Sequence, residues 1–155
     1  MKKQLLLILT LVLQILLAPA LLQERGLGGE VKAQITFQKT YGGIDYDFGY
    51  YVQQTSDSGY IIAGSTSSFG AGGNDVYLIR INAFGDTIWT KTYGGTINET
   101  TGYSGSLQQT SDGGYIIAGT TNSFGAGGLD VYLIKTDANG DTLWTKTYGG
   151  TSDDE

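Results

Sequence analysis

After residue 34, short apolar runs alternate with turns rich in Gly, Asn, Asp and Ser. Up to residue 95 this pattern predicts four strands, at about Tyr50–Thr55, Tyr60–Ser65, Asp75–Ile81 and Thr87–Tyr93. Short strands with a turn signal every 8–12 residues are typical of all-β sandwiches and barrels. The third strand is apolar on both faces, so we expect it to be covered on both sides. No window in this region has the period of a helix.

The same pattern occurs twice. Residues 53–95 and 108–150 are identical at 34 of 43 aligned positions, at an offset of 55. Upstream, 35–43 matches 87–95 at an offset of 52, so we place the three additional residues in the loop around 96–102. Four antiparallel strands per repeat of about 50 residues are typical of a β-propeller blade. A β-solenoid is the alternative, although its repeats are usually shorter.

The expected fold is all-β: two four-stranded antiparallel propeller-like blades plus an extra N-terminal strand, preceded by a signal-peptide helix. The repeat region spans 34–155, with units at about 44–95 and 96–150 and the start of a further unit at 151–155. Propellers close with about four to eight blades, so two blades leave apolar faces and edges uncovered. We therefore interpret the chain as a piece of a longer protein whose partners are further blades, with self-association of a short protomer as the alternative.

Residues 1–33 are predicted to be a signal peptide or an N-terminal anchor. Lys2 and Lys3 precede an apolar stretch, 5–17, and small residues follow at 18–20, which is the layout of a secretory signal. Cleavage is expected after Ala20 or Ala33. The alternative is an uncleaved anchor over 5–22, which is close to the length that spans a bilayer. Either interpretation predicts a secreted or cell-surface protein that meets a membrane only through this segment.

Composition excludes several kinds of chemistry. The chain has no Cys and no His, which excludes disulfides, thiol nucleophiles and Ser-His-Asp triads. Residues 34–155 carry five basic and thirteen acidic side chains, a balance that argues against nucleic-acid binding. We assign no catalytic, cofactor-binding or metal-binding residue and expect no cofactor.

The strings YGG, TSDGGYIIAG, SFGAGG and DVYLIKTDANGDTLW resemble repeats of secreted bacterial and archaeal proteins of β-propeller type. This resemblance covers about residues 35–155 and implies a non-enzymatic surface scaffold, adhesion module or ligand-binding module. The fold also resembles that of quinone-dependent dehydrogenases, but no quinone-site residue can be carried over. The alternative is a fragment of a secreted propeller enzyme, a carboxylate glycosidase or a quinone-type oxidoreductase, with its active site outside this chain.

Residues present in both copies are expected to build the blade. This applies to the matched turn aspartates and the matched tryptophans, which are Asp57 and Asp112, Asp75 and Asp130, Asp86 and Asp141, and Trp89 and Trp144. The glycine-rich loops 69–73 and 124–128 lack the following helix and the Lys of a phosphate loop. Residues 137–141 resemble the start of a calcium loop but lack its later Gly and Glu, so a hairpin is favoured and a calcium-stabilised adhesin is the weaker hypothesis.

Residues that break the repeat are better candidates for binding. They lie in the two loops between units and are Asp45, Tyr46, Asp47 and Tyr50, and Ile97, Asn98, Glu99 and Tyr103. Tyrosine rings can stack on sugars and carboxylates can accept hydroxyl hydrogen bonds, so these loops suggest a carbohydrate or another surface ligand. The alternative is a solvated linker.

Overall fold

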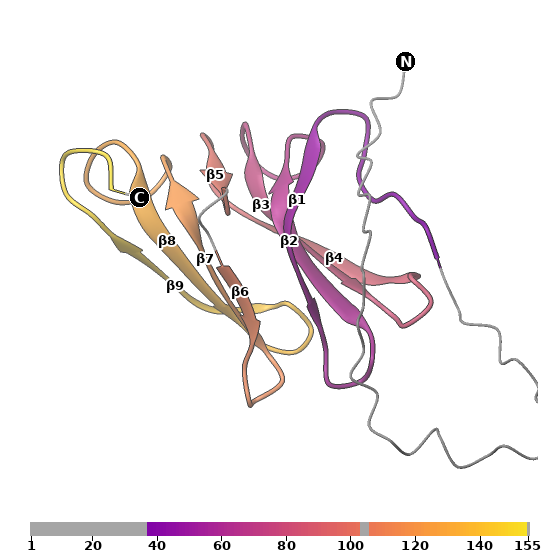
Figure 1. The fold of residues 1–155 in the computed structure, drawn as a ribbon. Coiled ribbons are helices and arrows are strands. Elements are labelled where there is room, and N and C mark those ends of the chain that lie inside the picture. Colours follow the sequence, from indigo (N-terminus) through magenta and orange to yellow (C-terminus); the bar gives the residue numbers. More distant parts are fainter. Residues whose placement is uncertain (1–36, 103–105, 155) are drawn as a thin grey trace, which may run out of the picture.

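The chain folds into two antiparallel β-sheets that lie side by side (Figure 1). The computed structural model describes residues 37–102 and 106–154, so the predicted signal peptide or anchor lies outside the described residues. Within the described part every regular element is a strand, which confirms the all-β prediction.

The first sheet follows the order of the sequence. It consists of β1 (Asp47–Gln54), β2 (Tyr60–Thr66), β3 (Asp75–Ile81) and β4 (Thr87–Tyr93). The predicted bounds of the third and fourth strands are confirmed. The first strand begins three residues earlier than predicted and carries an irregularity between Gly49 and Tyr51.

The second sheet has five strands, not the four predicted. They are β5 (Glu99–Thr100), β6 (Ser106–Gln109), β7 (Tyr115–Thr121), β8 (Asp130–Thr136) and β9 (Thr142–Tyr148). Both β5 and β6 pair with β7, and together they take the place that β1 has in the first sheet.

The register locates the three additional residues of the second unit. Glu99 pairs with Thr121 as Asp47 pairs with Thr66, whereas the residue pairs of β6 follow those of β1 at an offset of 55. The change from an offset of 52 to one of 55 therefore occurs between β5 and β6. The insertion divides one strand into two, which is why the expected four-stranded sheet contains five strands.

The extra N-terminal strand is not formed over residues 37–43, so this prediction is wrong for the described part of the segment. A strand needs a neighbour to pair with its backbone groups. In each sheet the fourth strand pairs with the third, but among the described residues no third strand precedes this segment. Within the described residues, this segment is held on the first sheet by contacts of its side chains.

Burial differs between the two sheets although their sequences nearly match. β3 is buried at every position, whereas β8 alternates between buried and partly exposed positions. The apolar core between the sheets contains one face of the first sheet and one face of the second, including Ile61, Leu78, Ile117 and Ile134. A smaller core covers the other face of the first sheet. The prediction that the third strand is covered on both sides is thus confirmed in the first sheet only.

The turn between β1 and β2 gives a test of backbone strain. Ser58 has a φ of 68°, and the matching Gly113 has a φ of 83° in the same hydrogen-bonded turn. The left-handed region costs an L-residue about 1–2 kcal/mol, whereas glycine enters it freely. Ser58→Gly is therefore expected to raise the free energy of unfolding by about 1 kcal/mol in urea denaturation.

The reverse exchange is the control. A Cβ at Gly113 would meet only Ala138, at 3.8 Å, so Gly113→Ser adds no clash and should lower stability through the backbone alone. Equal stabilities for the chain and Ser58→Gly would contradict this account.

Candidate functional site

Three contacts join the outer strand of the first sheet to the second sheet. The ring of Trp89 lies edge-on to that of Tyr115, with centroids 6.0 Å apart. Lys91 forms an ion pair with Asp141 at 2.7 Å. The buried hydroxyl of Tyr93 donates to the carbonyl of Gly140 at 2.7 Å. Successive alternate residues of β4 thus contact the facing strand and hairpin, which fixes how one sheet sits on the next.

The same three contacts occur on the opposite side of the first sheet. Phe37 lies edge-on to Tyr60 at 6.3 Å, Lys39 pairs with Asp86, and the Tyr41 hydroxyl donates to the carbonyl of Gly85 at 2.8 Å. We call residues 37–41 the N-terminal strap. Its side chains reproduce those of β4 although it is not a strand. The strap therefore covers the first sheet as the first sheet covers the second.

The hairpin glycine is required by this contact. Gly140 has a φ of 77°, and a Cβ there would lie 2.9 Å from ring atoms of Trp89. Asp137 accepts hydrogen bonds from the backbone N–H groups of Asn139 and Asp141, and Asn82 does the same in the first sheet. The oxygens that resembled a calcium loop therefore shape a turn that brings the glycine against the neighbouring sheet.

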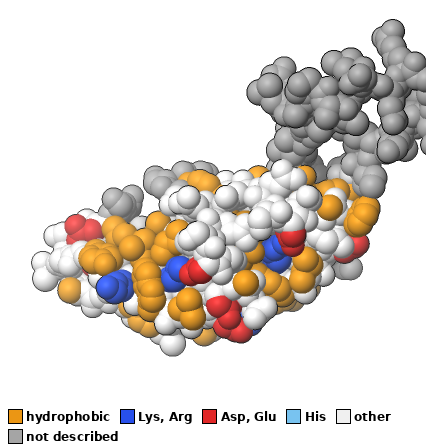
Figure 2. Space-filling model, turned by 90° about the horizontal axis from the view of Figure 1, so that it is seen from below, with side chains coloured by type: hydrophobic (Ala, Val, Ile, Leu, Met, Phe, Trp, Pro, Cys, Tyr) orange, Lys and Arg blue, Asp and Glu red, His pale blue; other side chains and the backbone are white. Residues whose placement is uncertain are grey.

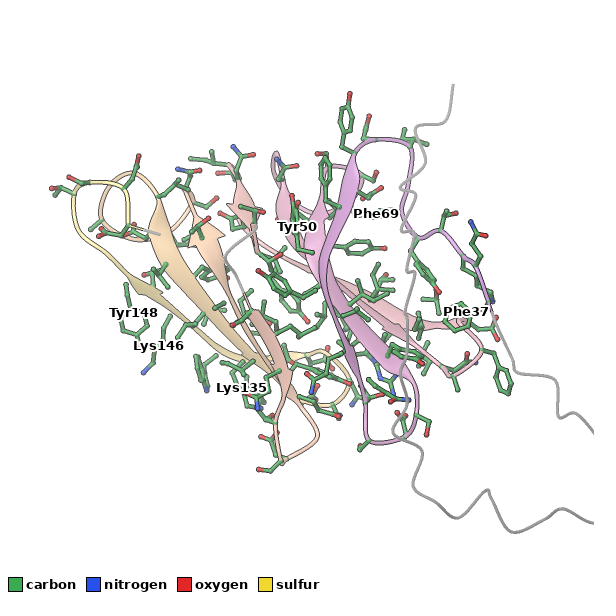
Figure 3. The ribbon with its side chains drawn as sticks, in the orientation of Figure 1. Phe37, Tyr50, Phe69, Lys135, Lys146 and Tyr148 are labelled. Carbon is green, nitrogen blue, oxygen red and sulfur yellow. The ribbon has the colours of Figure 1, made fainter. Side chains whose placement is uncertain are left out.

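The second sheet has one face with no such cover among the described residues. We call this the open face; it consists of Ile116, Ala118, Val131, Leu133, Trp144, Lys146 and Tyr148. Trp144 and Tyr148 are 41% and 52% exposed, whereas the matching Tyr93 is 8% exposed. Lys146 and Tyr148 project on the side of the molecule opposite to Phe37 (Figure 3). Hydrophobic side chains gather beside a basic group at this end (Figure 2).

Carboxylates hold the loops between units. Asp47 accepts hydrogen bonds from the Gly43 N–H and from the hydroxyls of Thr66 and Ser68. Glu99 accepts them from the Gly95 N–H, the Thr121 hydroxyl and the Ser123 N–H. Both acids are buried.

The end of the described chain, residues 150–154, shows the same arrangement. Asp154 accepts a hydrogen bond from the Gly150 N–H at 2.7 Å, and its own N–H donates to the carbonyl of Leu129. The N–H of Glu99 donates to Asn74 in the same way. Asp47, Glu99 and Asp154 thus have one role, and their spacings of 52 and 55 residues are the two offsets of the repeat.

A buried aspartate lies beside Glu99, and another lies beside Asp154. Asp75 accepts hydrogen bonds from the Ala71 and Gly72 N–H groups. A Cβ on Gly94 would collide with oxygens of both Asp75 and Glu99, so the two carboxylates are close together. Burial raises the pKa of Asp75, and the Glu99 charge raises it further against the opposing effect of the two N–H groups.

The matching Asp130 differs in its hydrogen bonding. It accepts a hydrogen bond from the Ala126 N–H through Oδ2, but its buried Oδ1 has no hydrogen-bond partner among the described residues. A Cβ on Gly149 would collide with this oxygen, so the Cα of Gly149 packs directly against it. The first Gly of each YGG string therefore makes room for a carboxylate.

Some of the residues proposed for ligand binding are buried and do not face solvent. Asp47 and Glu99 are buried and hydrogen-bonded, so they do not face solvent with the tyrosines. Asn98 accepts a hydrogen bond from the Asn74 N–H. Tyr103 lies outside the described residues.

Exposed aromatic rings remain at the start of β1. Tyr46 and Phe48 are 52% and 43% exposed, and their rings stack at 6.2 Å. Phe48 stacks in turn on Tyr50. Asp45, which precedes Tyr46 in the chain, is exposed, and its N–H donates to the Ser68 hydroxyl. The structure therefore forms an aromatic row that follows an exposed aspartate in the sequence.

Comparison with protein-family models and with curated proteins gave no match. Within residues 37–102 and 106–154, no group of three or more acidic side chains is placed to hold a metal ion. The same part of the chain contains no helix long and apolar enough to span a bilayer.

The two matched tyrosines allow the sheet contact to be tested within one chain. Tyr93→Phe leaves the Gly140 carbonyl without its buried donor, which typically costs about 1–3 kcal/mol of stability. Tyr148→Phe makes the same chemical change on the open face and should change stability by less than about 0.5 kcal/mol. Urea denaturation measures both, and equal losses would contradict the role given to the buried hydroxyl.

The paired acids predict a pH dependence. Because the folded-state pKa of Asp75 lies above its ordinary value of 3.8, folding is favoured while the group is protonated, and this stability is lost as pH rises through the raised pKa. Asp75→Asn keeps the acceptor for the loop N–H groups and removes the charge. We expect the variant to melt at a higher temperature than the parent at neutral pH. The two should converge near pH 4; parallel pH profiles would contradict the assignment.

Proposed function

We propose that this chain is an exported, non-enzymatic β-propeller-type repeat segment that acts as a surface scaffold, adhesion module or ligand-binding module. The observation that supports it is the repeated sheet contact. The strap meets the first sheet, and the first sheet meets the second, through one set of ring, ion-pair and hydroxyl contacts. A contact that repeats at a fixed interval is typical of a stacked array of blades.

The acidic residues favour a scaffold over a glycosidase. Glycoside hydrolysis uses two carboxyl groups that reach the sugar from opposite sides. The close pair of Asp75 and Glu99 is buried and is used by loop backbone and hydroxyl groups. Asp57 and Asp112 instead pair with Arg80 and Lys135 across the strand ends.

The proposed binding surface is the aromatic row of Tyr46, Phe48 and Tyr50. It lies at an edge strand of the first sheet, and the exposed Asp45 adds a hydrogen-bond acceptor. Rings and a carboxylate on a rigid sheet suit a carbohydrate or another surface ligand.

Export is the test of this proposal. The full chain produced in a bacterial host should reach the extracytoplasmic fraction, and protease added to intact cells should remove it if it is surface-bound. Mass spectrometry should find a new N-terminus at Leu21 or Gln34 if the signal is cleaved. A variant that lacks residues 2–33 is the control and should stay inside. Retention of the full chain in the cytoplasm would contradict the proposal.

A further inference from the structure

We propose that the open face of the second sheet docks onto the first sheet of another copy of this chain, where β9 takes the place of the N-terminal strap. The inference deepens the proposed function because both treat the sheets as stacking units. It concerns contacts between copies, however, and does not depend on export.

The chain carries both halves of its own internal interface. β9 presents Trp144, Lys146 and Tyr148, which match the three residues of β4 that contact the second sheet. The receiving half consists of Tyr115, Gly140 and Asp141, and the first sheet repeats it as Tyr60, Gly85 and Asp86. Docking would therefore reproduce a contact that the molecule already makes, including the complementary charges of Lys146 and Asp86.

The strap occupies that receiving half with a matching sequence. Residues 39–43, which begin within the strap, read KTYGG, and residues 146–150 read the same. The only change among the three contacting side chains is Phe37 in place of Trp144. The replacement can therefore keep the register of the lysine and the tyrosine.

The exchange favours docking because the strap contacts are replaced rather than lost. The copy that receives β9 gives up one ring contact, one ion pair and one hydroxyl hydrogen bond and regains all three. The copy that supplies β9 additionally buries Ile116, Ala118, Val131 and Leu133, which are only partly buried in the single chain. Burial of apolar surface is the term that must outweigh the entropy lost on association.

The contact joins two different surfaces, so each docked copy leaves another open face and another strap. Such heterologous contacts form closed rings or open filaments. With two sheets per copy, a ring of about four to eight sheets would contain about two to four copies.

The test uses the full chain purified from the producing cells, whichever cell fraction holds it, and measures its mass by sedimentation over a range of concentrations. The parent chain should associate as concentration rises. Phe37→Ala weakens the strap and should strengthen association by about tenfold or more. Trp144→Ala should abolish association. Leu143→Ala is the matched control, because its counterpart Ile88 is 54% exposed even in the covered sheet, and it should associate like the parent.

A charge exchange identifies the two surfaces. Lys146→Glu alone sets two acids against each other between copies, and Asp86→Lys alone sets two lysines against each other, so each variant should remain monomeric. Their mixture restores opposite charges at every contact and should associate. A monomeric parent together with a monomeric Phe37→Ala chain would overturn the inference, as would association that survives both charge variants. Neither result would alter the outcome of the export test.

Discussion

A strand with apolar side chains on both faces can be buried only between two neighbours, and this requirement governs the molecule. The string DVYLI occurs in β3 and β8. In β3 all of its residues are buried, whereas in β8 alternate residues are partly exposed. The sequence is constant and the neighbours differ, so burial here is a property of the stack and not of the single sheet.

The two sheets contact each other mainly through side chains. The buried carboxylates hold the chain segments that connect them. Asp47 and Glu99 each accept hydrogen bonds from a loop N–H and from the threonine hydroxyl at the end of the strand beside them, Thr66 in β2 and Thr121 in β7. They fix the path of the chain as it passes from one unit to the next. Asp75 holds the loop that precedes it in a similar way, and burial, with a smaller effect of the nearby Glu99 charge, raises its pKa.

Regular parts of the fold were predictable from the residues, whereas parts that depend on a neighbour were not. The bounds of β3 and β4 followed from apolar runs and turn residues. The predicted first strand begins three residues late because the residues before Tyr50, including Asp47, have the composition of a loop. Their pairing with β2 is visible only in the register. The division of one strand into β5 and β6 could not be predicted without the position of the insertion within the loop.

The candidate binding residues show the same limit. Asp47 and Glu99 were grouped with the residues that break the repeat because one is aspartate and the other is glutamate, although they are 52 residues apart, as 35–43 is from 87–95. The structure makes them equivalent through Gly43 and Gly95. The strap failed as a predicted strand because a strand requires backbone pairing, which the spacing of Phe37, Lys39 and Tyr41 does not supply.

The reuse of one contact set has a consequence for how such a chain changes during evolution. Each of the two sheets carries a Trp, a Lys and a Tyr on its last strand. Each also carries the Tyr, Gly and Asp that such a set contacts. Unequal crossing-over between the coding stretches of the two repeats would add or delete a whole sheet without creating a new kind of contact between sheets. The number of sheets can therefore change while every contact between sheets keeps its chemistry.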